Sequence, residues 1–231
     1  MWSLLTRILT VRRITCAFDN TGYSLPVGGV EGGETVAEAD LQPYVQAALD
    51  QIEYAIGDVS TPGGKLRAEH GHPEPFTNTK YVEIGNEDFF ASASYKEYRW
   101  RIFHDAIKAV YPDLHIIATT YPETTLEPKE EYSDRHVYQL PGWFQNETNR
   151  YDNEPRPGPL IFEGEYAAIS NNASDIYGTP ETGRIRYSTL EAAVGEGACE
   201  FSPRAHADAT DRKQVCTKIV ADIFRYLYSF A

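Results

Sequence analysis

The sequence predicts an α/β fold built on a parallel sheet, and two patterns carry this prediction. Short apolar strands alternate with amphipathic helices along the chain, as they do in βα units. Two of these strands end in glycine followed closely by glutamate, at Gly85-Asn86-Glu87 and Gly164-Glu165. Polar residues at strand ends are typical of a (β/α)8 TIM-type barrel, whose chemistry lies at the carboxyl ends of its strands. We therefore expect a partial barrel of this type.

The first predicted helix begins after Asp40, which can cap it, and runs to about Ile56. Its apolar residues follow the helical period, and Gly57 stops it. Residues 61–78 are rich in glycine, proline and histidine and are expected to form a loop. Residues 80–84, KYVEI, then predict a short strand that delivers Asn86 and Glu87 to its end.

The second predicted helix starts at Ser94, because Glu97 follows at the spacing of a capping box, and it ends before Pro112. A last helix is expected near Ser188, with Glu191 in the same relation to its start. The remaining predicted strands cover residues 114–121, 135–140 and 159–166.

Composition and charge exclude several classes of protein. The formal net charge is −13, from 34 acidic and 21 basic residues, which argues against binding to nucleic acid. The 16 Tyr, 10 Phe and 3 Trp suit neutral ligands with polar edges and apolar faces, such as sugars. No apolar run approaches the ~18 residues of a membrane span. The cysteines form no CxxC pair, so zinc is not expected, and their disulfide pairing cannot be read: Cys16, Cys199 and Cys216.

The chain start makes a poor secretion signal, because Arg7 and the pair Arg12-Arg13 interrupt its apolar residues. Two sequons, at Asn146 and Asn172, give a mild indication of a glycoprotein from a secretory lineage. The sequence predicts no particular oligomeric state.

Two carboxylates on neighbouring strand ends, Glu87 and Glu165, are expected to face each other across a small pocket. Retaining glycoside hydrolysis needs such a pair about 5–5.5 Å apart, one to protonate the leaving oxygen and one to attack the anomeric carbon. Asn86 would supply a neutral donor for a sugar hydroxyl. The alternative is that both acids are solvated or cap a helix, since strand-end carboxylates are common in α/β folds.

The neighbouring polar residues receive structural interpretations. We expect Glu83 and Glu163 to be supporting polar residues, and Asp88 to cap the turn after its strand. Asp134 is expected to make structural hydrogen bonds rather than to act as a third catalytic acid. The pair in His70-Gly71-His72 is interpreted as solvated, because it lies in a loop of glycine and proline.

Several segments together resemble the α-L-arabinofuranosidases of glycoside hydrolase family fifty-one, particularly their fungal branch. GNE and GEYA in this order, each at a strand end, are specific, whereas GNE alone indicates only the wider group of barrel glycosidases. The matching segments are LQPYVQAALDQIEYAIGD, GGKLRAEHGHPEPF, KYVEIGNEDFF, YKEYRWRIFHDAIKAVYPDLHIIATT, DRHVY, PLIFEGEYA and TLEAAV, within residues 40–198.

The resemblance implies a role for each matched residue. Glu87 corresponds to the general acid/base, Glu165 to the nucleophile, and Asn86 to the residue that binds the sugar 2-hydroxyl. His136 and Tyr138, in DRHVY where the family usually reads DEHYY, correspond to its active-site His and Tyr. The Tyr hydroxyl would hydrogen-bond the nucleophile, and Trp143 would border the pocket. The family needs no cofactor and no metal, and it is extracellular.

The chain also departs from the family. Residues 1–39 match poorly and residues 199–231 diverge, so the first two barrel strands and the C-terminal β-sandwich are expected to be missing. A full barrel takes ~250 residues, and this chain has 231. Because a barrel that lacks strands has unpaired edges, we expect the isolated chain to be unstable or weakly active.

The resulting hypothesis is retaining hydrolysis of terminal α-L-arabinofuranosyl groups in arabinoxylan, arabinan or arabino-oligosaccharides. One alternative is another retaining barrel glycosidase, such as a β-xylosidase or an endoglucanase. The other is a non-catalytic carbohydrate-binding protein derived from such an enzyme.

Overall fold

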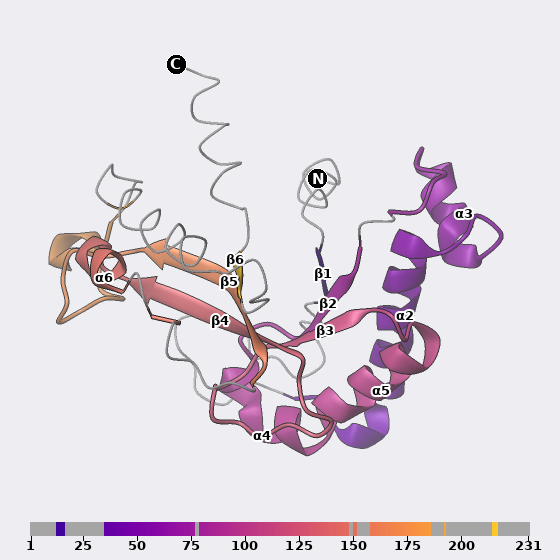
Figure 1. The fold of residues 1–231 in the computed structure, drawn as a ribbon, viewed down its shortest axis with the longest axis horizontal. Helices are drawn as coiled ribbons and strands as arrows, with labels where there is room; N and C mark the ends of the chain where they lie inside the picture. Colours follow the sequence, from indigo (N-terminus) through magenta and orange to yellow (C-terminus); the bar gives the residue numbers. More distant parts are fainter. Residues whose placement is uncertain are drawn as a thin grey trace. The chain divides into compact units, whose positions relative to one another are not determined.

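The computed structural model describes residues 13–16, 35–76, 79–147, 150–151, 158–185, 192 and 214–216. These residues belong to two compact units, residues 1–133 and 134–231, and each is described by itself. Figure 1 shows the elements of both units as a ribbon, coloured along the sequence from indigo at the N-terminus to yellow at the C-terminus.

The first unit contains parallel strands in the order β1-β2-β3-β4. They are β1 (Arg13–Cys16), β2 (Tyr81–Ile84), β3 (His115–Ala118) and the beginning of β4 (Tyr132–Gln139). In the register of β2 and β3, Tyr81 lies opposite His115 and Ile84 lies opposite Ala118. The predicted α/β class with parallel strands is therefore confirmed, and the side chains at the end of β2 emerge at the carboxyl edge of this sheet.

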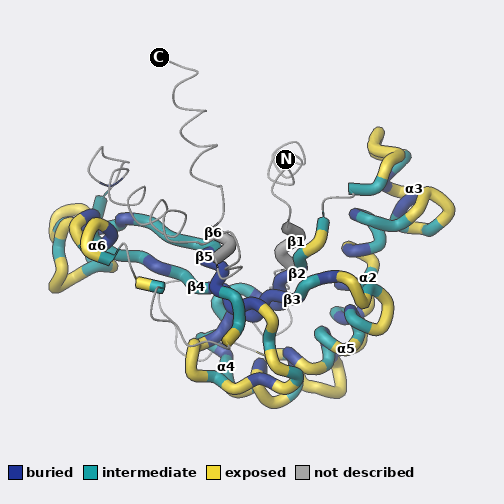
Figure 2. The backbone as a smooth tube through the Cα atoms, in the orientation of Figure 1, coloured by how far each residue is buried: buried dark blue, intermediate teal, exposed yellow. Residues whose placement is uncertain are grey.

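Helices on β2 and β3 complete the core of the first unit. The long helices α2 (Gln42–Ile56) and α5 (Trp100–Val110) contact each other, and α5 also contacts β2. Their apolar faces share one cluster with the strands, which appears as the dark-blue stretches of the tube in Figure 2. Trp100 is fully buried in this cluster, and its indole Nε1 donates to the carbonyl oxygen of Pro128 at 2.6 Å.

Shorter helical turns connect these elements. They are η1 (Glu38–Asp40), α3 (Pro62–Glu69), η2 (Asp88–Ala91), α4 (Ser92–Ser94) and the π-helical turn η3 (Tyr95–Arg99). Among the described residues, no helix is both long enough and apolar enough to cross a membrane.

The second unit is built on the rest of β4 and on β5 (Leu160–Ala168), which pairs in parallel with β6 (Gln214–Cys216). Its other described elements are α6 (Pro141–Asn146) and the 3₁₀ turn η4 (Pro180–Thr182). A small apolar cluster joins β4, α6 and β5, and consists of Val137, Phe144, Ala168 and Ala192 with Trp143 and Tyr166 packed against it. This cluster holds the ends of β4 and β5 against α6.

Three local predictions were wrong. Asp40 does not cap the first helix: it belongs to η1, and the N-cap of α2 is Leu41, with no side-chain cap hydrogen bond. The expected loop contains the helix α3, whose N-cap Thr61 accepts a hydrogen bond from the Gly64 amide at 3.1 Å. No capping box forms at Ser94, because its hydroxyl donates to the carbonyl of Ala91 instead.

The helix expected near Ser188 lies outside the described residues, apart from residue 192. Most of segments 1–39 and 199–231 also lies outside them, so the predicted boundaries of these segments stay predictions. Within them the structure describes β1 and β6, two strands for which the sequence pattern gave no indication.

Candidate active site

The turn after β2 presents Asn86 and Glu87, and its backbone conformation is unusual. Gly85 has a φ of 93°, and Glu87 has a φ of 52° and a ψ of 36°, in the left-handed region. Such a conformation costs a residue with a side chain roughly 1–2 kcal/mol, so the surroundings must hold it in place. Both Asn86 and Glu87 are half-buried.

Three hydrogen bonds fix the backbone of this turn within the first unit. The buried hydroxyl of Tyr95 donates to the carbonyl of Ile84 at 2.7 Å, at the end of β2. The amide of Glu87 donates to the Thr119 hydroxyl at 3.1 Å, at the end of β3. The amide of Asn86 donates to Asp88 Oδ2 at 3.2 Å. The end of β2 is thus tied both to the neighbouring strand and to η3.

A buried ion pair lies beneath the turn. Asp88 Oδ1 accepts from Arg99 Nη1 at 2.5 Å, and the two side chains are 0% and 3% exposed. Burial raises the pKa of Asp88 to about 6, and the guanidinium of Arg99 opposes this rise. The expectation that Asp88 caps the turn agrees with its bond to the Asn86 amide, but the pairing with Arg99 was not predicted.

Glu165 lies within β5, which continues to Ala168 and so does not end at this residue as predicted. Its carboxylate meets two side chains of β4. The hydroxyl of Tyr138 donates to Glu165 Oε2. His136 Nδ1 lies 3.6 Å from the same oxygen. The side chain of Glu165 is 40% exposed whereas that of His136 is 4% exposed, so the carboxylate is reachable and its partners lie behind it. The structure therefore brings together three of the residues that the sequence singled out.

Asp134 supports this arrangement from beneath. Its Oδ2 lies 3.0 Å from His136 Nε2, and its Oδ1 accepts from the amide of Gly164 at 2.7 Å. It is buried, and it holds both the imidazole and the backbone beside Glu165. Its contacts are those of the structural hydrogen-bonding residue that the sequence predicted.

A second acid, Glu163, lies two residues before Glu165 on β5 and is buried. The Tyr151 hydroxyl donates to Glu163 Oε2 at 2.5 Å. Burial raises the pKa of Glu163, and the hydrogen bond from Tyr151 and the charge of Arg150 oppose this. Glu163 is thus a supporting polar residue, as expected, although nothing in the sequence indicated Tyr151 as its partner.

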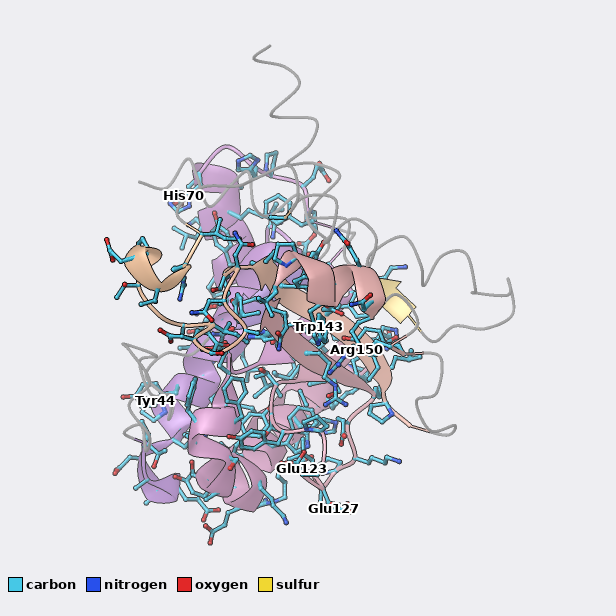
Figure 3. All side chains as sticks on the ribbon, turned by 90° about the vertical axis from the view of Figure 1, so that its left-hand side faces the viewer. Tyr44, His70, Glu123, Glu127, Trp143 and Arg150 are labelled. Atoms are coloured by element: carbon cyan, nitrogen blue, oxygen red, sulfur yellow. The ribbon has the colours of Figure 1, made fainter. Side chains whose placement is uncertain are left out.

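Trp143 lies on α6 and is half-buried. The guanidinium of Arg150 lies 5.2 Å from the centre of its ring, and Figure 3 shows the two labelled side chains close together. Phe144 meets the same ring edge-on at 5.2 Å. The place of Trp143 at the edge of a pocket stays a prediction.

Metal binding needs several ligating side chains in one place. Within either unit taken alone, the described residues bring no three His, Cys, Asp or Glu side chains to ligating distance of one another.

Parallel strands with glutamates at or near their carboxyl ends are the arrangement that barrel glycosidases use. The family model described as "Alpha-L-arabinofuranosidase 1 domain" matches residues 8–156. The chain therefore belongs to the α-L-arabinofuranosidase family, and the resemblance seen in the sequence is confirmed.

Individual relatives agree with this assignment. Alpha-L-arabinofuranosidase 2 of Arabidopsis thaliana is 37% identical over 184 residues, 79% of this chain and 25% of that protein. A probable alpha-L-arabinofuranosidase A of Aspergillus flavus is 41% identical over 148 residues, 62% of this chain and 23% of that protein. An extracellular exo-alpha-L-arabinofuranosidase of Streptomyces chartreusis is 39% identical over 145 residues, 58% of this chain and 17% of that protein.

A solved structure confirms the partial barrel. The arabinose-bound structure of a GH51 α-L-arabinofuranosidase is 47% identical and superposes with a TM-score of 0.71. The superposition covers 79% of this chain and 28% of that one. The chain thus spans about a quarter of the length of the relatives that it matches.

Proposed function

We propose that this chain carries the catalytic glutamates of a retaining α-L-arabinofuranosidase, with Glu165 as nucleophile and Glu87 as general acid/base. The observation that carries the proposal is the cluster around Glu165 on β5. Tyr138 and His136 both meet Oε2 of this partly exposed carboxylate, and among the described residues no partner of its Oε1 is seen. A carboxylate held in this way, in a member of this family, is suited to attack a sugar carbon.

The first step forms a bond between a Glu165 oxygen and the anomeric carbon, while the bond from that carbon to the leaving oxygen breaks. Glu87 gives its proton to the leaving oxygen and becomes a carboxylate. Tyr138 keeps Glu165 oriented through its hydrogen bond, and Asn86 hydrogen-bonds the 2-hydroxyl of the sugar.

In the second step Glu87 removes a proton from a water molecule, which attacks the same carbon. The ester bond to Glu165 breaks, arabinose leaves with its original configuration, and Glu87 is protonated again. The mechanism requires the two carboxyl groups to come within about 5–5.5 Å of each other in the active protein.

The substrate is proposed to be a terminal α-L-arabinofuranosyl group of arabinoxylan, arabinan or an arabino-oligosaccharide. Support comes from the family assignment and from the relative whose solved structure holds arabinose. An extracellular site of action is proposed as well, because one relative is described as extracellular and polymers of this kind lie outside cells.

The test is turnover of 4-nitrophenyl α-L-arabinofuranoside by the full chain and by Glu165→Ala. We expect the wild-type chain to release 4-nitrophenol and the variant to lose at least about a thousandfold in kcat, because the nucleophile is gone. Glu123→Ala is the matched control, since Glu123 is exposed on the loop after β3 and its removal should leave turnover unchanged.

Three results would contradict the proposal. Turnover that survives in Glu165→Ala would show that Glu165 is not the nucleophile. Turnover of 4-nitrophenyl β-xyloside, with none of the arabinofuranoside, would indicate a β-xylosidase. Arabinose binding by a folded chain without turnover, unaffected by Glu87→Gln, would indicate a carbohydrate-binding protein.

A further inference from the structure

The ion pair between Asp88 and Arg99 takes no part in the reaction proposed above, yet it lies directly beneath Glu87. Both side chains are almost completely buried. Buried ion pairs add little net stability, because desolvation of the two charges offsets their attraction. The raised pKa of Asp88 agrees with this balance, since burial outweighs the attraction of Arg99. A contribution to stability therefore does not explain why this ion pair is present.

The contacts of the pair indicate a geometric role. Asp88 uses one oxygen for Arg99 and the other for the amide of Asn86. Arg99 in turn donates Nη2 to the carbonyl of Ala91 at 3.0 Å and Nε to the hydroxyl of Ser94 at 3.0 Å. The pair thus connects the turn after β2 to the helical turns that follow it, and each of its polar groups is used.

The turn is also shaped around the carboxylate of Asp88. A Cβ atom on Gly85 would lie 1.8 Å from Asp88 Oδ2, so only glycine lets the acid approach the backbone this closely. Glu87 follows in a left-handed conformation that an L-residue with a side chain rarely adopts. The strained backbone of Glu87 and the buried acid therefore occupy the same few residues.

We propose that Asp88 and Arg99 are positioning residues that hold the backbone of Asn86 and Glu87 so that the Glu87 carboxyl can reach the leaving oxygen. The inference rests on the proposed role of Glu87 as general acid. Neither residue touches the substrate, and both act through the turn. Loss of either one lets the turn relax and moves the acid away from its place.

A comparison of leaving groups tests the proposal. A poor leaving group such as methanol depends strongly on protonation by Glu87, whereas 4-nitrophenol depends on it much less. A displacement of about 1 Å can cost about a hundredfold in rate. In Asp88→Ala and Arg99→Met we expect kcat/KM, which reports the step that releases the leaving group, to fall about ten- to a hundredfold more for methyl α-L-arabinofuranoside than for the 4-nitrophenyl substrate.

Arg67→Met is the matched control. Arg67 is another fully buried arginine of the same unit, and its guanidinium donates to the carbonyls of Tyr54, His72 and Pro73. Its loss should destabilise the fold but lower kcat/KM for both substrates by the same factor. If Asp88→Ala and Arg99→Met also lower both rates equally, the pair is merely structural and the proposal is wrong.

Hydrogen exchange gives a second test that needs no activity. In Asp88→Ala the amides of Asn86 and Glu87 should lose protection, while those of residues 116–118 in β3 should keep it. In Asp88→Asn, which retains an acceptor oxygen, much of this protection should return. Unchanged protection at Asn86 and Glu87 in Asp88→Ala would overturn the proposal.

The two tests also separate this proposal from the proposed function. If the wild-type chain turns over neither substrate, the proposed function of this chain is contradicted. The exchange experiment still decides whether the ion pair holds the turn.

Discussion

The burial of Asp88 determines both its contacts and its pKa. It is buried next to Arg99, it accepts a hydrogen bond from the backbone of Asn86, and burial raises its pKa from 3.8 to about 6. A carboxyl whose pKa is higher in the folded than in the unfolded state favours folding when it is protonated. The stabilising contribution of Asp88 is therefore complete below pH 3.8 and is lost as the pH rises through about 6.

This sign gives a prediction for Asp88→Asn, which cannot titrate at this position. Between pH 4 and pH 7, the free energy of unfolding of the wild-type chain should fall relative to that of the variant, by up to ~3 kcal/mol. Urea unfolding of the two proteins in parallel over this range measures the difference, and all other titrating groups cancel. A difference that stays constant with pH, or that grows in favour of the wild type, would contradict the assignment.

The resemblance to a known family predicts roles for five residues: Asn86, Glu87, His136, Tyr138 and Glu165. The contacts of Glu165 with Tyr138 and His136 agree with that prediction. Asp88 and Arg99 could not be paired from sequence, because 11 positions and three helical turns separate them. Their pairing depends on where the backbone turns after Gly85, and no periodic pattern describes that turn.

Among the elements, α3 shows how composition misleads. Its sequence contains one proline and two glycines, which are typical of a loop, and so the sequence predicted one. The proline occupies the start of the helix, where it costs no hydrogen bond, and Thr61 caps the first turn. Arg67 adds three hydrogen bonds to backbone carbonyls, so tertiary contacts outweigh the poor intrinsic propensity of glycine. The pair Thr61-Pro62 is the sequence feature that could have indicated the start of this helix.

A prediction at this scale concerns the cap. Thr61→Ala removes the acceptor of the Gly64 amide and should lower the free energy of unfolding by about 1 kcal/mol. Thr61→Ser keeps the hydroxyl and should remain close to the wild type. Thermal unfolding followed by circular dichroism measures both, and an alanine variant as stable as the serine variant would show that the cap contributes nothing.

The start of the second predicted helix failed for a related reason. The chain passes through a π-helical turn, Tyr95–Arg99, before the regular helix α5 begins at Trp100. This turn directs Tyr95 to the end of β2 and Arg99 to Asp88, just after it. A capping box at Ser94 and Glu97 would be compatible with a regular helix, but the contacts of Arg99 with Ser94 and Asp88 decide the local structure instead.

For the molecule as a whole, alternation of apolar strands and helices predicted the α/β class correctly, and the parallel pairings confirm it. The strands β1 (RITC) and β6 (QVC) could not be predicted in this way, since each contains only two apolar residues, whereas β2 and β3 contain three. The proposed reaction needs one glutamate from each compact unit: Glu87 from the first and Glu165 from the second. The proposed catalysis therefore depends on both units.

Trapping of the covalent intermediate tests this claim most directly. In Glu87→Gln the second step is slow, because no carboxylate activates the water, so reaction with 4-nitrophenyl α-L-arabinofuranoside should leave an arabinosyl ester on the protein. Intact mass and peptide mapping should find a single arabinosyl group on Glu165, with none in Glu87→Gln/Glu165→Ala. An ester on another residue, or no ester while 4-nitrophenol is still released, would contradict the account.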